Sequence, residues 1–201
     1  VFIDDGCVES CNTHERFMKI TRLCDIVRQF NGINCHYASI GDPQKILHLS
    51  SITSDEMESI IKAESSFLAK FNALQSLTSK QDFLEVAKTQ CLRQDALSLA
   101  CGFVFVPDIC INIAKRLMQA VALGRGSSVA DGVSFCDDRD EQVKILRPLK
   151  DLSELEVENY NNFNSIDSIP TSSYGADAGN FASIQNLTSS FINGIQENFS
   201  S

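Results

Sequence analysis

Short apolar runs alternate along the chain with longer segments of helical periodicity, and this alternation constrains the fold more than any other feature. Four runs have the composition and length of strands, at residues 1–4, 34–40, 103–106 and 143–146. The helical segments lie at about 13–30, 78–100, 109–123 and 152–163. Strands that alternate with helices of this length predict parallel pairing, because parallel neighbours need crossover connections. We expect an α/β fold: an open parallel sheet with helices on both faces.

Two stretches fall outside this alternation. Residues 44–78 have a weak pattern with two short helices, at about 55–62 and 63–74, and we interpret them as an insertion. Residues 164–180 are rich in Ser, Asn, Gly and Pro, which predicts a linker, and residues 181–201 regain helical spacing. The expected organisation is therefore an α/β domain over 1–163, a linker and a C-terminal helical extension. Since the chain opens on an apolar strand, we expect an internal piece of a longer protein.

Several residues have the character of helix caps. Thr78 and Gln81 fit a capping box, and Gly124 fits a left-handed C-cap. Asp108 and Asp151 precede two helical segments and fit N-caps. For these two aspartates, capping alone is the alternative to a role in binding.

The charge balance limits the partners that this surface can hold by itself. The chain has 17 Lys and Arg against 26 Asp and Glu, a net charge of −9, so it is not expected to grip nucleic acid or an anionic membrane unaided. Every basic residue lies between Arg16 and Lys150, which makes residues 151–201 an acidic extension. The longest apolar stretch, 99–106, is too short to cross a bilayer.

The cysteines favour reduced thiols in the cytoplasm over disulfides. There are eight, and several lie inside apolar runs, where cysteine behaves as a small hydrophobic residue. Cys7, Cys11 and His14 are close in sequence but lack the tight Cys-x-x-Cys pair of a structural zinc site. We therefore predict no metal site, and the sequence identifies no catalytic residue.

Charged residues and a glycine follow the predicted strands. Open α/β sheets bind ligands beyond the carboxyl ends of their strands, which selects Asp5, Gly6 and Asp108 as candidates for nucleotide binding. By the same rule Arg147 and Lys150 are candidates for phosphate contact, although solvated charges are the alternative. Arg125, between two glycines, is a further candidate, although a helix end followed by a flexible loop explains those glycines equally well.

Four segments carry a family resemblance. LMQAVALGRGS at 117–127 and VKILRPLKDLSELEVENY at 143–160 resemble the cytoplasmic tRNA 2-thiolation protein 2 family, within the PP-loop ATP-pyrophosphatase superfamily. VFIDDG at 1–6 is similar to the second strand of that superfamily, and SIQNLTSSFINGIQENF at 183–199 resembles the C-terminal helix of the family. The resemblance implies a PP-loop-like, Rossmann-like fold in a cytoplasmic protein.

The resemblance also implies a function. Members act in the 2-thiolation of the wobble uridine (mcm5s2U) of tRNA Lys, Glu and Gln, as a heterodimer with the catalytic tRNA 2-thiolation protein 1. Sulfur arrives on a thiocarboxylated ubiquitin-like carrier, the complex consumes ATP, and Arg125, Arg147 and Lys150 become candidates for tRNA contact. The glycine-rich loop that holds pyrophosphate and the cysteine pair of active relatives have no counterpart in these 201 residues.

We therefore expect a non-catalytic or half-site subunit of the thiolation complex. Two alternatives remain open at this point: a self-sufficient ATP-dependent adenylating enzyme of the same superfamily, and a non-catalytic interaction scaffold.

Overall fold

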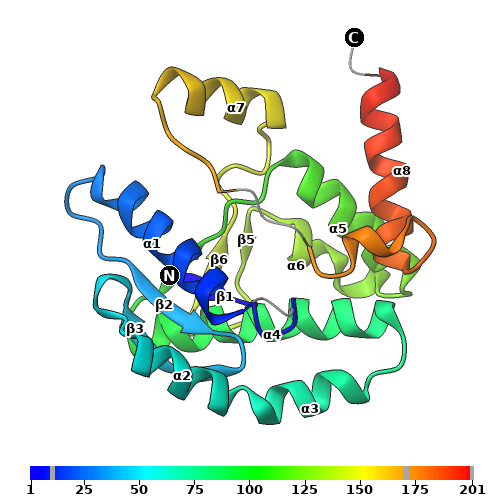
Figure 1. Cartoon of the computed structure of the whole chain (residues 1–201). Coiled ribbons are helices and arrows are strands. Elements are labelled where there is room, and N and C mark those ends of the chain that lie inside the picture. The colour runs from blue at the N-terminus through cyan, green and yellow to red at the C-terminus, as the bar shows by residue number, and fades with distance from the viewer. Residues whose placement is uncertain (10–11, 170–172, 200–201) are drawn as a thin grey trace.

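The computed structural model describes residues 1–9, 12–169 and 173–199, and helices and strands alternate along them (Figure 1). The strands are β1 (Phe2–Asp4), β2 (His36–Ser39), β3 (Asp42–His48), β4 (Phe103–Phe105), β5 (Cys136–Asp137) and β6 (Lys144–Leu146). The helices are α1 (Thr13–Arg28), α2 (Ser54–Ala63), α3 (Ser65–Ala73), α4 (Leu77–Ser98), α5 (Cys110–Ala122), α6 (Val129–Val133), α7 (Glu154–Phe163) and α8 (Ile184–Phe199). Short 3-10 turns lie at Leu49–Ser51, Gly126–Ser128 and Ala176–Ala178.

The fold is α/β, but the described strands form two three-stranded sheets and not one parallel sheet. The strand orders are β1-β2-β3 and β4-β6-β5. In each sheet one pair is parallel, β1 with β2 and β4 with β6, while β3 and β5 join antiparallel. The expectation of all-parallel pairing is therefore wrong for β3 and β5, neither of which the sequence predicted as a strand.

Most of strand β3 lies in the stretch that the sequence marked as an insertion, at 44–78. It follows β2 through the tight turn at Ile40 and Gly41, and a hairpin of this kind needs no crossover helix. Pro43 hides the strand from sequence patterns, but it is tolerated because β3 is an edge strand.

Helices cover both faces of the first sheet. Tyr37 packs with Ile20 of α1 and with Met57 and Ile60 of α2 in one apolar cluster. Ile40, on the opposite side of the pleat, packs with Phe71 of α3 and Leu84 of α4 in a second. Helix α4 also contacts β4, so one helix lies against strands of both sheets (Figure 1).

A buried ionic network joins β1, β2, α1 and the junction of α2 with α3. The Arg16 guanidinium donates to Asp4 Oδ2 at 2.7 Å and to Glu64 Oε1 at 2.6 Å. The Tyr37 hydroxyl donates to the same Asp4 oxygen at 2.6 Å, and the Ser39 hydroxyl donates to Glu64 at 2.5 Å. Buried charges are tolerated when they are paired and hydrogen-bonded in this way.

The predicted helices are present, but three of the four predicted caps are wrong. Helix α4 is capped by Ser76, whose hydroxyl accepts the Ser79 N–H at 3.0 Å, and not by a Thr78–Gln81 box. Helix α5 has Ile109 at its N-cap position, one residue after Asp108. Helix α7 is capped by a Ser153–Glu156 box.

Other interactions explain these three errors. Thr78 and Gln81 hydrogen-bond to the C-terminal segment, Asp108 forms ion pairs with arginines, and Asp151 pairs with Lys150. The fourth prediction is confirmed: Gly124 ends α5 with φ of 74°, and the Arg125 N–H donates to the Ala120 carbonyl at 2.8 Å.

The C-terminal segment packs back onto the rest of the molecule, with α8 beside α5 and α4 (Figure 1). The Ile184 N–H donates to Thr78 Oγ1 at 3.2 Å, and Gln81 Nε2 donates to the Tyr174 carbonyl at 2.8 Å. Gly175 turns the approach to α8 with φ of 74°, and a Cβ there would lie 2.6 Å from Leu77 Cδ1. Polar contacts and one glycine thus seat this segment on α4.

Two further findings concern the described residues as a group. None of their helices combines the length and the apolar character needed to cross a membrane. Within those same ranges no three His, Cys, Asp or Glu residues gather closely enough to hold a metal ion. Of the weighed set Cys7, Cys11 and His14, Cys11 lies outside the described residues, and burial raises the pKa of the Cys7 thiol to about 12.

Candidate functional site

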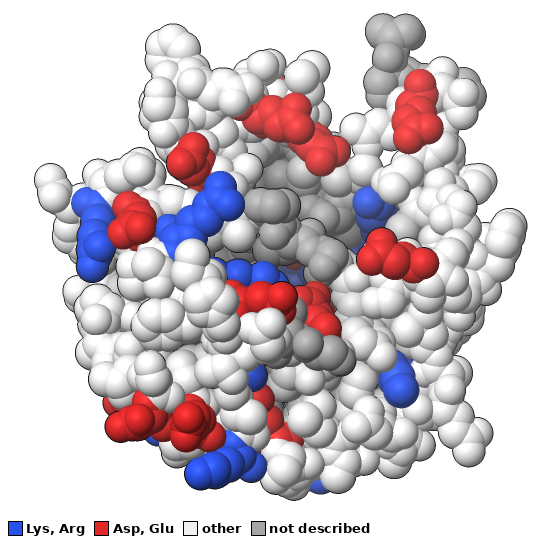
Figure 2. Space-filling model, in the orientation of Figure 1, with Lys and Arg blue, Asp and Glu red and all other residues white. Residues whose placement is uncertain are grey.

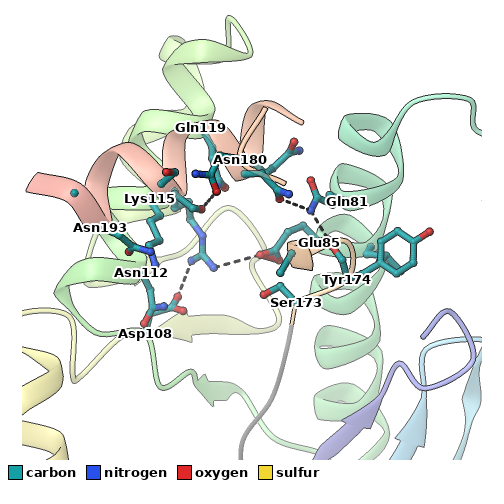
Figure 3. A pocket seen from close by; sticks show the side chains of 18 of the residues that line it. Gln81, Glu85, Asp108, Asn112, Lys115, Gln119, Ser173, Tyr174, Asn180 and Asn193 are labelled. Carbon is teal, nitrogen blue, oxygen red and sulfur yellow. Dashed lines mark hydrogen bonds and ion pairs between the residues drawn. The ribbon is translucent and has the colours of Figure 1, made fainter. Parts of the chain in front are cut away.

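Two adjoining cavities lie along α4 and α5, and they share Asp108 and Arg116 as wall residues. The first, of about 680 Å³, lies between α4, α5, the 173–180 segment and α8 (Figure 3). We call it the amide cavity for its seven carboxamide side chains: Gln81, Asn112, Gln119, Asn180, Gln185, Asn186 and Asn193. The second, of about 550 Å³, we call the arginine cavity because Arg116, Arg125, Arg139 and Arg147 line it.

Asp108 and Arg147 meet because β4 and β6 are parallel neighbours, so that the segments following them leave the sheet at the same edge. Asp108 Oδ2 lies 3.3 Å from Arg147 Nε. The same oxygen accepts from Arg116 Nη1 at 2.6 Å, and Arg116 also lies 4.0 Å from Glu85 of α4 (Figure 3). One carboxylate is therefore held between two guanidinium groups.

Arg147 is nearly inaccessible, with 5% of its surface exposed. Its Nη1 donates to the Ser134 carbonyl at 3.1 Å and to the Asp131 carbonyl at 3.4 Å. Burial, followed by the nearby Arg116 charge, lowers the pKa of Arg147 from its ordinary value. An arginine stays charged in proteins, so this group supplies a fixed positive charge at the cavity wall.

Arg125 lies at the rim of the arginine cavity, where its side chain is about half exposed. Asp82 of α4 accepts two parallel hydrogen bonds from it, at 2.5 and 2.7 Å. These hydrogen bonds raise the pKa of Arg125. A bidentate pair of this kind fixes the orientation of the guanidinium more firmly than a single contact would.

Asp137 anchors a further group of cations beside the same cavity. It is buried, and it accepts from Arg139 Nη2 at 2.7 Å and from Arg93 Nη2 at 3.3 Å. The Arg139 hydrogen bonds hold the pKa of Asp137 below its usual range. Sequence reasoning missed Arg93, Arg116 and Arg139, because a basic residue on a helix or in a loop is most often simply solvated.

The structure brings together three of the six candidate residues. Asp108, Arg125 and Arg147 line the arginine cavity. Asp5 is linked to it indirectly, through a 2.6 Å ion pair with Lys88, which lines both cavities. Lys150 is in neither wall, and its ammonium lies 3.1 Å from Asp151.

The three residues predicted to bind a nucleotide, Asp5, Gly6 and Asp108, do not by themselves form a phosphate-binding site. The Gly6 N–H donates to the Asp4 carboxylate at 2.9 Å, so it is not free to meet a phosphate. Asp5 and Asp108 are carboxylates already paired with Lys88 and with two arginines. A phosphate site needs converging N–H donors or free cations, and these three residues supply neither.

The arginine cavity has the opposite charge balance to the whole chain. Five basic and four acidic side chains line it, whereas the chain carries −9. On the face of the molecule that Figure 2 shows, acidic and basic side chains are interleaved. A cavity of this kind can orient an anionic group of a larger ligand, but the acidic surface around it opposes strong binding to a polyanion.

The most informative comparisons are with curated insect proteins. One from Anopheles gambiae is 36% identical over 208 aligned residues, which span the whole chain. One from Drosophila erecta is 42% identical over 144 residues, 70% of the chain, and one from Aedes aegypti is 37% identical over 128 residues, 64% of the chain. Each of these three proteins is named cytoplasmic tRNA 2-thiolation protein 2.

The chain belongs to the cytoplasmic tRNA 2-thiolation protein 2 family. It spans about half of the length of the Anopheles protein, 48%, and 36% and 28% of the Drosophila and Aedes proteins. No family profile and no solved structure matches it. The cavities described above therefore lie in a part of the longer proteins that this family comprises.

Proposed function

We propose that the chain is part of a cytoplasmic subunit of the tRNA thiolation complex, required for 2-thiolation of the wobble uridine of tRNA Lys, Glu and Gln. The observation that carries this proposal is the 36% identity along the whole chain to a protein named for this modification. The arginine cavity supports it with fixed positive charge at one place on an acidic chain. In this proposal, catalytic tRNA 2-thiolation protein 1 is the heterodimer partner and supplies most phosphate contacts.

The candidate residues take different roles in the proposal because their exposure differs. Arg125 and Lys150, which reach the surface, would contact tRNA phosphates. Arg147 is buried, so it would act as a positioning residue that holds Arg116 through Asp108. Asp5, Gly6 and Asp108 would border a nucleotide site completed by other residues, and the sulfur would come from a thiocarboxylated ubiquitin-like carrier.

We also propose that the α/β unit at 1–163 is a PP-loop-like, Rossmann-like domain, joined by 164–180 to the C-terminal helix. The parallel pairs β1–β2 and β4–β6 support this, since each is connected through helices. Strands β1 and β4 each have only one neighbour among the described strands, and α4 contacts both. A strand from elsewhere in the longer protein, placed between β1 and β4, would join the two sheets into one.

The direct test of the proposed function is to delete the gene and to weigh the wobble nucleoside of the three tRNAs. Loss of 2-thiouridine, restored by the full-length protein, is the expected result. Unchanged 2-thiouridine would reject the function.

Titration of tRNA binding against salt tests the residues in the intact heterodimer. Arg125→Ala should weaken binding and reduce the slope of log affinity against log salt by about one. Arg28→Ala, an exposed arginine paired with Asp25 on α1, is the matched control and should leave the slope unchanged. Equal slopes for the two variants would remove Arg125 from the tRNA interface.

A further inference from the structure

The amide cavity has an unusual composition for a groove between helices. Its seven carboxamides come from α4, α5, the segment before α8, and α8 itself, and they face a common space (Figure 3). A carboxamide carries both a donor and an acceptor, so a wall of such groups suits a ligand edge that alternates donors and acceptors. Its volume of about 680 Å³ lies in the range of small-ligand sites.

Some of these carboxamide atoms form hydrogen bonds within the protein, whereas others have no hydrogen-bond partner among the described residues. Gln81 Nε2 donates to Asn186 Oδ1 at 3.0 Å, and Asn186 Nδ2 donates to the Gly175 carbonyl at 2.9 Å. The acceptors Gln81 Oε1 and Gln185 Oε1 are buried and have no hydrogen-bond partner in the described part of the chain. A buried acceptor without a partner is costly, so turning such a glutamine side chain into the cavity to accept a hydrogen bond from a ligand would favour the complex.

The cavity also has one cation that is not neutralised within the described residues. Of its three basic side chains, Arg116 is paired with Asp108 and Lys88 with Asp5, whereas Lys115 of α5 forms no ion pair there. Lys115 lies one turn before Gln119 on the same helix and points toward the cavity (Figure 3). Lys115 therefore offers one positive charge beside the donors and acceptors of the carboxamides, while the exposed Glu197 carboxylate also lines the cavity, so that its three basic and three acidic side chains balance.

We propose that the amide cavity holds one unpaired nucleotide of an RNA, with its phosphate on Lys115 and its base edge on the carboxamides of Gln185 and Asn193. A nucleobase edge alternates donors and acceptors, and asparagine and glutamine are the side chains that pair with such edges. This inference rests on the proposed function, which makes tRNA the RNA concerned. Recognition here is by base edges, because the Tyr174 ring at the wall already packs against Phe71 at 5.1 Å.

The test compares binding of the full-length heterodimer to an anticodon stem-loop, which has unpaired nucleotides, with binding to a fully paired RNA duplex. Lys115→Met and Asn193→Leu should each weaken stem-loop binding by about tenfold, the effect of losing one charge-assisted or well-formed hydrogen bond. Duplex binding should not change. The matched controls are Lys70→Met and Asn72→Leu, at exposed positions of α3 away from the cavity.

The outcomes separate this inference from the function on which it rests. Suppose that the wild-type complex binds and thiolates tRNA, and that both cavity variants bind the stem-loop with wild-type affinity. The proposed nucleotide site is then wrong, and the proposed function stands. Loss of binding to the thiocarboxylated carrier, with RNA binding intact, would overturn the site in favour of a carrier-tail groove. A wild-type complex that neither binds nor thiolates tRNA would reject both the nucleotide site and the proposed function. Thermal unfolding of each variant shows that it is folded.

Discussion

Individual buried charged residues hold elements of this structure together, and the sequence pattern does not predict which charged residues are buried. Arg16 lies on a helix with one apolar face, where a basic residue is expected to be solvated, yet it is buried between Asp4 and Glu64. Its burial depends on carboxylates 12 and 48 residues away along the chain. Contacts over such separations come from the tertiary fold, so periodicity along one helix cannot predict them.

Removal of the Arg16 charge should destabilise the protein strongly. Arg16→Met leaves two buried carboxylates without their cation, and breaking a buried pair in this way costs about 3–5 kcal/mol. Arg28→Met, at an exposed pair, should cost about 0.5 kcal/mol. Urea unfolding of the full-length protein measures both, and equal costs would mean that the buried network adds nothing.

Asp95 of α4 should limit stability at neutral pH. It is fully buried, its closest side-chain partner is the Cys91 thiol at 3.7 Å, and its Oδ1 has no hydrogen-bond partner among the described residues. Burial raises the pKa of this carboxyl, while Cys91 and His36 act in the opposite direction. Between the ordinary pKa of about 3.9 in the unfolded chain and the higher pKa of the folded state, the folded protein therefore keeps a proton that the unfolded chain releases.

This difference fixes the sign of the pH dependence. The contribution of Asp95 is fully present below pH of about 4 and is lost as the pH rises toward the higher pKa of the folded state. Asp95→Asn should raise the free energy of unfolding at pH 7 by about 1 kcal/mol and change it little near pH 3. Unfolding at the two pH values checks this, and equal shifts at both would show that Asp95 does not titrate between the states.

At the scale of elements, helices were predictable and their ends were not. Apolar spacing located α1, α4 and α5, which each bury residues, and it also located α7, none of whose residues is buried. The predicted caps Thr78 and Asp108 failed because a capping side chain can equally bind a distant partner, here the C-terminal segment and two arginines. The same holds for the candidate site. Asp108 and Arg147 were predicted because they follow strands, whereas Arg116 lies within a helix, at a position that no sequence pattern distinguishes.

The seating of α8 depends on polar contacts that a substitution can remove. Gln81→Leu eliminates the hydrogen bonds to Tyr174 and Asn186, so the amides of α8 should exchange with solvent severalfold faster in the full-length protein. Gln90→Leu, at an exposed position on the same helix, should leave α8 exchange unchanged. Equal protection of α8 in both variants would show that other contacts hold it.

For the whole molecule, the sequence predicted the class of the fold but not the division into two sheets. Alternating strands and helices imply α/β architecture, while pairing partners are long-range choices that no local pattern encodes. The antiparallel strand β3 and the two-residue strand β5 were not predicted for this reason. On β4, Phe103 and Phe105 remain 58% and 66% exposed, which is unusual for aromatic residues of a strand.

Covering of β4 in the longer protein can be measured directly. If a further strand pairs with β4 and buries these rings, Phe105→Ala in the full-length protein should cost about 3–5 kcal/mol, as in a core. If the Phe105 ring stays exposed, Phe105→Ala should lower the free energy of unfolding by only about 0.5 kcal/mol. Met18→Ala, at an exposed position of α1, should have an effect of the same size. Equal small losses for both variants would refute the joined sheet.

Gly175 has a consequence for how this family can diverge. Most exposed positions after Gly175 tolerate substitution, whereas at Gly175 the left-handed backbone, with φ of 74°, strains any larger residue, and a Cβ there would also displace the Leu77 side chain. Across species, we expect the exposed residues 176–178 to vary freely while Gly175 itself is retained. Evolutionary constraint would then be concentrated at a site with no side chain at all.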